Sequence, residues 1–88
     1  MRSFKNTAAL VRTKRTGHPK NYSQAELSIL LGYKNGQFIS NVERGLCNIP
    51  LNTMAKISEV LSITPEELKA AMLKDHDDTL TGYFSESA

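Results

Sequence analysis

The side chains best suited to hydrogen-bond another molecule lie in one short stretch, residues 37–41. Gln37 and Asn41 are four residues apart, so in a helix they lie one above the other on the same face. A carboxamide can bind bidentately to a planar edge such as N6 and N7 of adenine, with ~1–3 kcal/mol of discrimination for a good pair. Ser40 adds a hydroxyl that could support a base edge or a phosphate. The alternative, that these are ordinary solvated residues of a helix, stays open at this point.

Basic residues are concentrated in the same half of the chain. The net charge is only +2, yet residues 1–48 hold eight Lys or Arg against two acids, and residues 49–88 hold three against seven. A basic half joined to an acidic half is typical of a surface that binds a polyanion and turns its acidic side away. A surface that merely happens to be polarised has the same composition, so charge alone does not separate the two.

No grouping of reactive side chains indicates catalysis or metal binding. Cys47 is the only cysteine, and His18 and His76 are far from it and from each other in the sequence. A lone cysteine excludes an internal disulfide and the multi-cysteine zinc patterns, and it indicates a reducing compartment. The acidic run 75–78 could chelate a divalent ion weakly, but a solvated acidic segment explains it more simply. We therefore expect no enzymatic activity, no metal and no cofactor.

Length and hydropathy favour one small cytoplasmic domain. The chain has 88 residues, of which 40% are hydrophobic and 23% charged, an ordinary soluble composition. Its longest apolar runs, such as residues 29–31, are far shorter than the ~20 residues that span a bilayer. No apolar segment follows the basic start, so no secretory signal is visible and no membrane contact is expected.

The apolar spacing predicts helices and no strands. A first helix is expected over about residues 6–16, followed by a loop containing Gly and Pro. Ser23 and Glu26 form a capping box that starts the second helix, and Gly32 should end it.

The third helix should carry the polar stretch. We expect Asn35 as its N-cap and a helix running to Arg44, with Gly45 ending it and with Ile39 and Val42 facing inward.

Two more helices follow in the second half. The fourth should begin near Pro50 or Leu51, and Thr64 with Pro65 should start the fifth. Their expected inward residues are Met54, Ile57 and Leu61, then Leu68, Ala71, Met72 and Leu73. From residue 75 the chain is acidic and rich in Ser and Thr, so we expect a domain over 1–74 and a tail over 75–88 that is flexible or ordered only against a partner.

The order of these elements resembles the Cro/repressor-type (XRE, lambda-repressor-like) DNA-binding family over about residues 7–74. The resemblance is carried by Ser23-Gln24-Ala25-Glu26-Leu27, Gly32, Ile39-Ser40-Asn41-Val42-Glu43-Arg44-Gly45, Pro50, Ile57, Leu61 and Ile63-Thr64-Pro65-Glu66-Glu67-Leu68. It implies an all-α, five-helix lambda-repressor-like bundle with an acidic C-terminal tail, in which residues 23–45 form a helix-turn-helix. The second helix of such a pair enters the DNA major groove.

The resemblance also implies roles for individual residues. The expected base contacts are Gln37, Asn41 and Ser40. The expected DNA-backbone contacts are Gln24, Lys34, Asn35, Gly36, Arg44 and Asn48, where Gly36 would let the backbone approach DNA closely. Glu43, an acid inside the basic half, is expected to pair with an arginine of the first helix, Arg15 first and Arg12 second.

Two departures from the family pattern bear on these assignments. Ser28 stands where the family usually has alanine, and it is small enough to fit under the third helix. The turn 32–36 is one residue longer than usual, which places Phe38 rather than Ile39 at the usual spacing from Gly32. The assignment of the base-contacting residues is therefore open by one position.

The resulting hypothesis is that the chain is a sequence-specific transcriptional regulator of bacterial or phage origin, and we expect it to be a repressor. Because one helix reads few base pairs, a homodimer on a palindromic double-stranded operator is expected, with the C-terminal tail as a possible contact to a partner. The alternatives are an antitoxin with the same DNA-binding domain and a protein-interaction module that has lost DNA binding.

Overall fold

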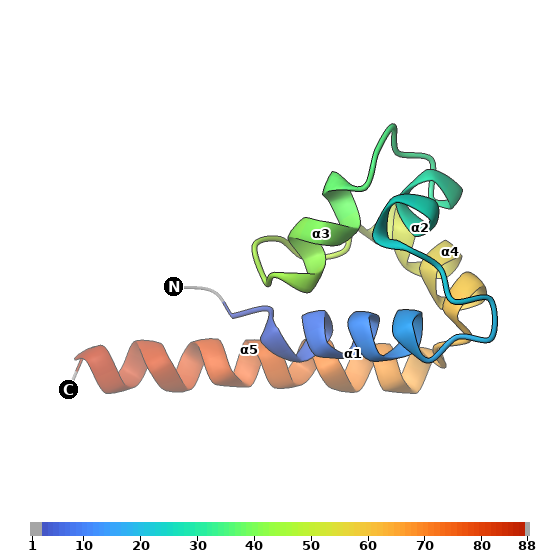
Figure 1. The fold of residues 1–88 in the computed structure, drawn as a ribbon. Coiled ribbons are helices and arrows are strands. Elements are labelled where there is room, and N and C mark those ends of the chain that lie inside the picture. Colours follow the sequence, from blue (N-terminus) through green and yellow to red (C-terminus); the bar gives the residue numbers. More distant parts are fainter. Residues whose placement is uncertain (1–2, 88) are drawn as a thin grey trace.

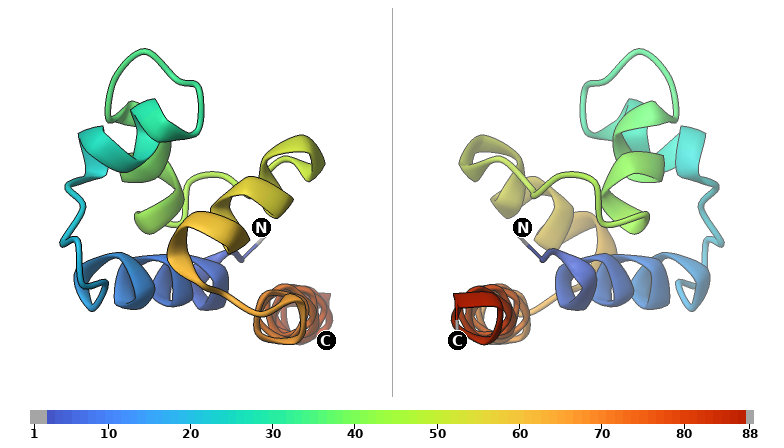
Figure 2. Two further views of the ribbon diagram at one scale, coloured as in Figure 1. Left: turned by 90° about the vertical axis from the view of Figure 1, so that its right-hand side faces the viewer. Right: turned by 90° about the vertical axis from the view of Figure 1, so that its left-hand side faces the viewer.

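The computed structural model describes residues 3–87, and within them it contains five helices and no strand. Residues 1–2 and 88, at the ends of the expected domain and tail, lie outside this range. The helices are α1 (Lys5–Thr16), α2 (Gln24–Leu30), α3 (Gln37–Glu43), α4 (Leu51–Leu61) and α5 (Pro65–Ser87). The prediction of an all-α chain is confirmed. Helices α1 and α5 lie side by side and run in opposite directions, and α2, α3 and α4 cover one side of this pair (Figures 1 and 2).

Two helices begin where local hydrogen bonding predicts. In the capping box of α2, the Glu26 N–H donates to Ser23 Oγ and the Ser23 N–H donates to Glu26 Oε1, both at 3.0 Å. Thr64 and Glu67 make the same reciprocal pair at the start of α5, both at 3.1 Å. Both starts expected from the sequence are confirmed, because a cap depends on residues only three positions apart.

The third helix differs from the expectation at both ends. Its N-cap is Gly36, not Asn35, and it runs from Gln37 to Glu43 rather than over 35–44. The physical reason is that Asn35 Oδ1 accepts the Gln37 N–H at 2.9 Å, which forms a turn before the helix begins.

The core lies where the five helices meet. Val11, Leu27, Ile39, Val42 and Ile57 are fully buried. The remaining buried hydrophobic residues of this cluster are Leu31, Ile49, Leu61, Ile63 and Leu68. The inward positions expected for α3 are thus confirmed, and Ile39 rather than Phe38 is the fully buried residue, which fixes the side of α3 that faces the core.

The predicted inward face of α4 and α5 is only partly buried. Met54 and Met72 are half-buried, and Leu73 is 59% exposed. They line an apolar groove of about 680 Å³ between the two helices, together with Leu51 and Leu68. The expectation that Leu73 packs inward is therefore wrong, because no described element covers this side of α5.

The boundary expected at residue 75, between the domain and a tail that is flexible or ordered only against a partner, falls inside helix α5. Helix α5 continues without interruption to Ser87 and projects beyond the other helices (Figure 1). Asp75, at the expected boundary, is buried and hydrogen-bonds to the start of α1. Among the described helices, none has both the length and the apolar content needed to cross a membrane.

Candidate nucleic-acid interface

A buried hydrogen bond sets how α3 lies on α2. The hydroxyl of Ser28, which is fully buried, accepts the backbone N–H of Ile39 at 3.1 Å. This N–H belongs to the first turn of α3, where backbone donors have no partner within the helix. An alanine at position 28 would fit the space but would leave this donor unsatisfied. Ser28 therefore contributes a hydrogen bond in addition to being small enough to fit.

Gly36 brings the start of α3 against α2. A Cβ at position 36 would lie 3.0 Å from the Cα and 3.1 Å from the backbone N of Ala25. The missing side chain is therefore required by packing between the two helices. This packing gives the glycine an internal role, and its expected role in the close approach of DNA stays a prediction.

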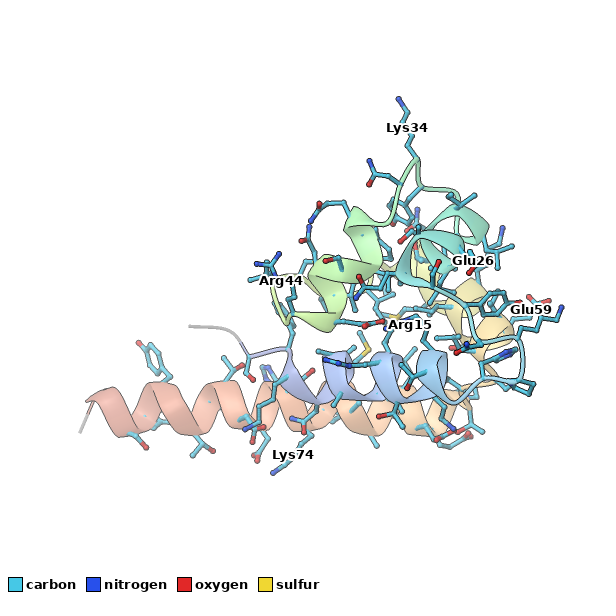
Figure 3. The ribbon with its side chains drawn as sticks, viewed as in Figure 1. Arg15, Glu26, Lys34, Arg44, Glu59 and Lys74 are labelled. Atoms are coloured by element: carbon cyan, nitrogen blue, oxygen red, sulfur yellow. The ribbon has the colours of Figure 1, made fainter. Side chains whose placement is uncertain are left out.

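The longer connection between α2 and α3, residues 31–36, is packed in place by aromatic side chains. Tyr33 stacks on Phe38 with ring centroids 4.0 Å apart, and its hydroxyl lies 3.3 Å from Thr53 Oγ1 of α4. Lys34, next to Tyr33, points away from the bundle at the tip of this connection (Figure 3).

The two carboxamides of α3 pair with each other on its solvent side. Gln37 Nε2 donates to Asn41 Oδ1 at 2.8 Å, and the buried Ile39 and Val42 occupy the opposite side of the helix. Within residues 3–87, no hydrogen bond is made by Gln37 Oε1 or Asn41 Nδ2. The pair thus leaves one acceptor atom and one donor atom without a partner. By helical spacing, Ser40 and Arg44 lie on the same side of α3.

Arg44 lies at the exposed end of this face, and Lys34 lies at the other end beyond the start of α3 (Figure 3). The structure thus brings together the amide pair, Ser40 and two of the expected backbone contacts. Asn35 and Gly36 lie at the start of the helix, where the first serves the turn and the second the packing described above.

An ion pair ties α1 to the end of α3. Arg15 Nε lies 2.6 Å from Glu43 Oε2, and Arg15 Nη2 donates to Glu43 Oε1 at 2.9 Å. The two side chains are 14% and 3% exposed, and hydrogen bonding to Glu43 raises the pKa of Arg15. The expected pair is confirmed with Arg15, and Arg12 is not the partner.

Gln24 joins this ion pair. Its Nε2 donates to Glu43 Oε1 at 3.1 Å, so one end of the carboxamide is held against α3 rather than turned to solvent. The Arg15 Nη1 group also donates to the carbonyl of Tyr22 at 3.1 Å, just before α2. The start of α2 and the end of α3 are therefore fixed to each other through one carboxylate.

The side chain of Asn48 hydrogen-bonds within its own connection and not to Gln37 or Asn41. Its Oδ1 accepts the N–H of Ile49 at 2.9 Å, and the residue lines a small polar cavity with Asp75 and Thr79 of α5. The sequence did not predict the Ser28–Ile39 hydrogen bond or the burial of Asp75. Each depends on a partner from another helix, and no local sequence pattern indicates such a partner.

Neither an activated thiol nor a metal-binding cluster is found among the described residues. Cys47 is half-buried, and burial raises the pKa of its thiol, which disfavours the thiolate. Among the residues that the structure describes, no three His, Cys, Asp or Glu side chains lie close enough to hold a metal ion.

Comparisons of the chain with protein-family models, with curated proteins and with solved structures find no match.

Proposed function

We propose that this chain is a sequence-specific double-stranded-DNA-binding transcriptional regulator, in which α2 and α3 act as a helix-turn-helix and α3 as the recognition helix. The observation that carries the proposal is the paired carboxamide of Gln37 and Asn41, held on the solvent face of a helix whose other side is locked in the core.

The open atoms of this pair suit a base edge. Gln37 Oε1 can accept from adenine N6, and Asn41 Nδ2 can donate to N7 of the same or a neighbouring purine. The pair is already ordered by its own hydrogen bond, so less side-chain freedom is lost on binding. Ser40 and Arg44 extend the same face, and Lys34 lies beyond its other end, where a phosphate of the groove wall would meet it.

We propose that the regulator binds a palindromic operator as a homodimer, since one short helix reads only a few base pairs. Two recognition helices related by a two-fold axis would lie about 34–36 Å apart on the duplex. The apolar groove between α4 and α5 is the surface we assign to the second copy. It continues along α5 through Leu73, Leu80 and Phe84, which are exposed and share one face of the helix. Repression then follows from occupation of the operator.

Selection of bound duplexes from a random pool tests the proposal. The full chain should enrich a palindrome, and Gln37→Ala and Asn41→Ala should each lower the preference for one base pair per half-site by about 1–3 kcal/mol. Asn52→Ala, which removes an exposed carboxamide from α4, is the matched control and should change nothing. No enriched sequence, or unchanged preference in both α3 variants, would contradict the proposal.

The exposed apolar groove also favours a second candidate, an antitoxin or another protein-binding module in which α4 and α5 hold a different protein. Co-purification of a small protein at 1:1 stoichiometry, lost in Leu73→Glu, would support this candidate over the homodimer.

A further inference from the structure

A cleft of about 280 Å³ opens beside the end of α3, between that end and the first half of α1. The α1 side consists of Lys5, Ala8, Ala9 and Arg12, which share one face of the helix at spacings of three and four. Arg44 lies on the α3 side. The two alanines are short, so they leave room between the three cationic side chains.

The cleft keeps its positive charge because its one acid is already neutralised. The Glu43 oxygens accept hydrogen bonds from Arg15 and Gln24, and the side chain is 3% exposed. Within residues 3–85, no carboxylate lies within 4.0 Å of the charged groups of Lys5, Arg12 or Arg44.

Other cations of α1 are used differently. Lys14 pairs with Glu67 at 3.0 Å, and Arg15 pairs with Glu43. A hydrogen bond from Asn6 is the main cause of the lowered pKa of Asp78, and the charge of Lys5 adds a smaller contribution without an ion pair between the two residues. Of the four cations of α1, Lys5 and Arg12 are therefore the two that form no ion pair among the described residues.

The cleft adjoins the amide face of α3. Arg44 follows Asn41 by three residues and so lies on the same side of the helix, at the end nearest the start of α1 (Figure 3). A duplex that meets Gln37 and Asn41 with its base edges carries its flanking strand past Arg44.

We infer that this cleft binds the phosphodiester backbone of the DNA strand flanking the groove read by α3, with Lys5 and Arg12 of α1 as contacts beside Arg44. The inference rests on the proposed function. An arginine guanidinium matches two phosphate oxygens bidentately, and an ammonium binds a phosphate as a point charge. These contacts fix the position of the protein on the duplex and do not read its sequence.

The test compares the full chain with Arg12→Gln, Lys5→Gln and the double variant on the duplex selected by the wild-type protein. Each phosphate contact that is lost should make the slope of log K against log salt less steep by about 1. Base preference and thermal stability should stay the same, because neither side chain is buried. Lys56→Gln on α4 removes an exposed cation away from the cleft and should leave the slope unchanged.

A double variant with the wild-type slope would overturn the inference while leaving the proposed function intact. A changed base preference would also overturn it, since these residues would then be reading sequence. If the wild-type chain binds no DNA, both the inference and the proposed function are overturned. That result is obtained before any variant is compared.

Discussion

Asp75 of α5 accepts two hydrogen bonds from Thr7 of α1, one from the backbone N–H at 3.1 Å and one from the hydroxyl at 2.6 Å. Its other oxygen accepts the backbone N–H of Asn6 at 2.7 Å. Phe4 occupies the N-cap position of α1 and has no side-chain oxygen with which to cap the helix. A carboxylate 68 residues away therefore caps α1, and the same contact holds α5 against the bundle past residue 74.

Replacing this carboxylate should be costly. Asp75→Ala removes charge-assisted bonds from a side chain that is 4% exposed and leaves backbone donors unsatisfied, so we expect a loss of about 2–4 kcal/mol in the free energy of unfolding. Urea denaturation measures it. Asp77→Ala, on the exposed side of the same helix, should stay within about 0.5 kcal/mol of the wild type. Equal effects of the two variants would show that the cap contributes little.

Two glycine-to-alanine changes should have opposite signs. Gly36→Ala would place a Cβ 3.0 Å from the backbone of Ala25 and push α3 away from α2, at a cost of about 1–3 kcal/mol. A Cβ added at Gly82, in the last third of α5, meets nothing within 4 Å, so Gly82→Ala should stabilise the helix by about 0.5–1 kcal/mol. Thermal unfolding of both variants checks the pair, and stabilisation by alanine at position 36 would refute the close packing.

Loss of Glu43 should impair folding and DNA binding together. Glu43→Ala leaves the Arg15 guanidinium, 14% exposed, without its bidentate partner, and breaking a buried pair from one side costs about 3–5 kcal/mol. It also releases Gln24 from α3. The free energy of unfolding, measured by chemical denaturation, and the affinity for the duplex should decrease together. Glu59→Ala, on the exposed side of α4, should change neither quantity. Lost binding at unchanged stability would count against a structural role for the pair.

Acid should destabilise the fold through its helix caps. Hydrogen bonds from Ser23 lower the pKa of Glu26 below its ordinary value of 4.5, and those from Thr64 and Lys14 do the same for Glu67. Because the folded-state pKa values are the lower ones, the stabilisation is complete above pH 4.5 and is lost as the pH falls through them.

Unfolding midpoints measured from pH 7 down to pH 3 should therefore decline below about pH 4.5. In the double variant Glu26→Gln and Glu67→Gln this decline should be shallower, since neither replacement titrates. An identical decline in the wild type and the double variant would place the acid sensitivity elsewhere.

Features that depend on neighbours a few residues apart could be predicted from the sequence. The capping boxes at Ser23 and Thr64 and the glycines that end α2 and α3, with φ of +96° and +73°, lie where local rules place them. The inward faces of Ile39 and Val42 follow from helical periodicity. The shared face of Gln37 and Asn41 on α3 could be predicted for the same reason. An arginine partner for Glu43, by contrast, was implied only by the family resemblance.

Tertiary structure alone decided the rest, because it depends on side chains brought together from distant segments. The choice of Arg15 over Arg12, the bond from Ser28 to Ile39 and the cap of α1 by Asp75 each join two helices. The acidic composition after residue 74 indicated a tail that is flexible or ordered only against a partner, but composition does not show that a buried carboxylate accepts hydrogen bonds from backbone donors of α1. Together with Asp78 and Thr79, which hydrogen-bond to Asn6 and Ser3, this carboxylate anchors α5 to the bundle, and the helix continues from there to Ser87.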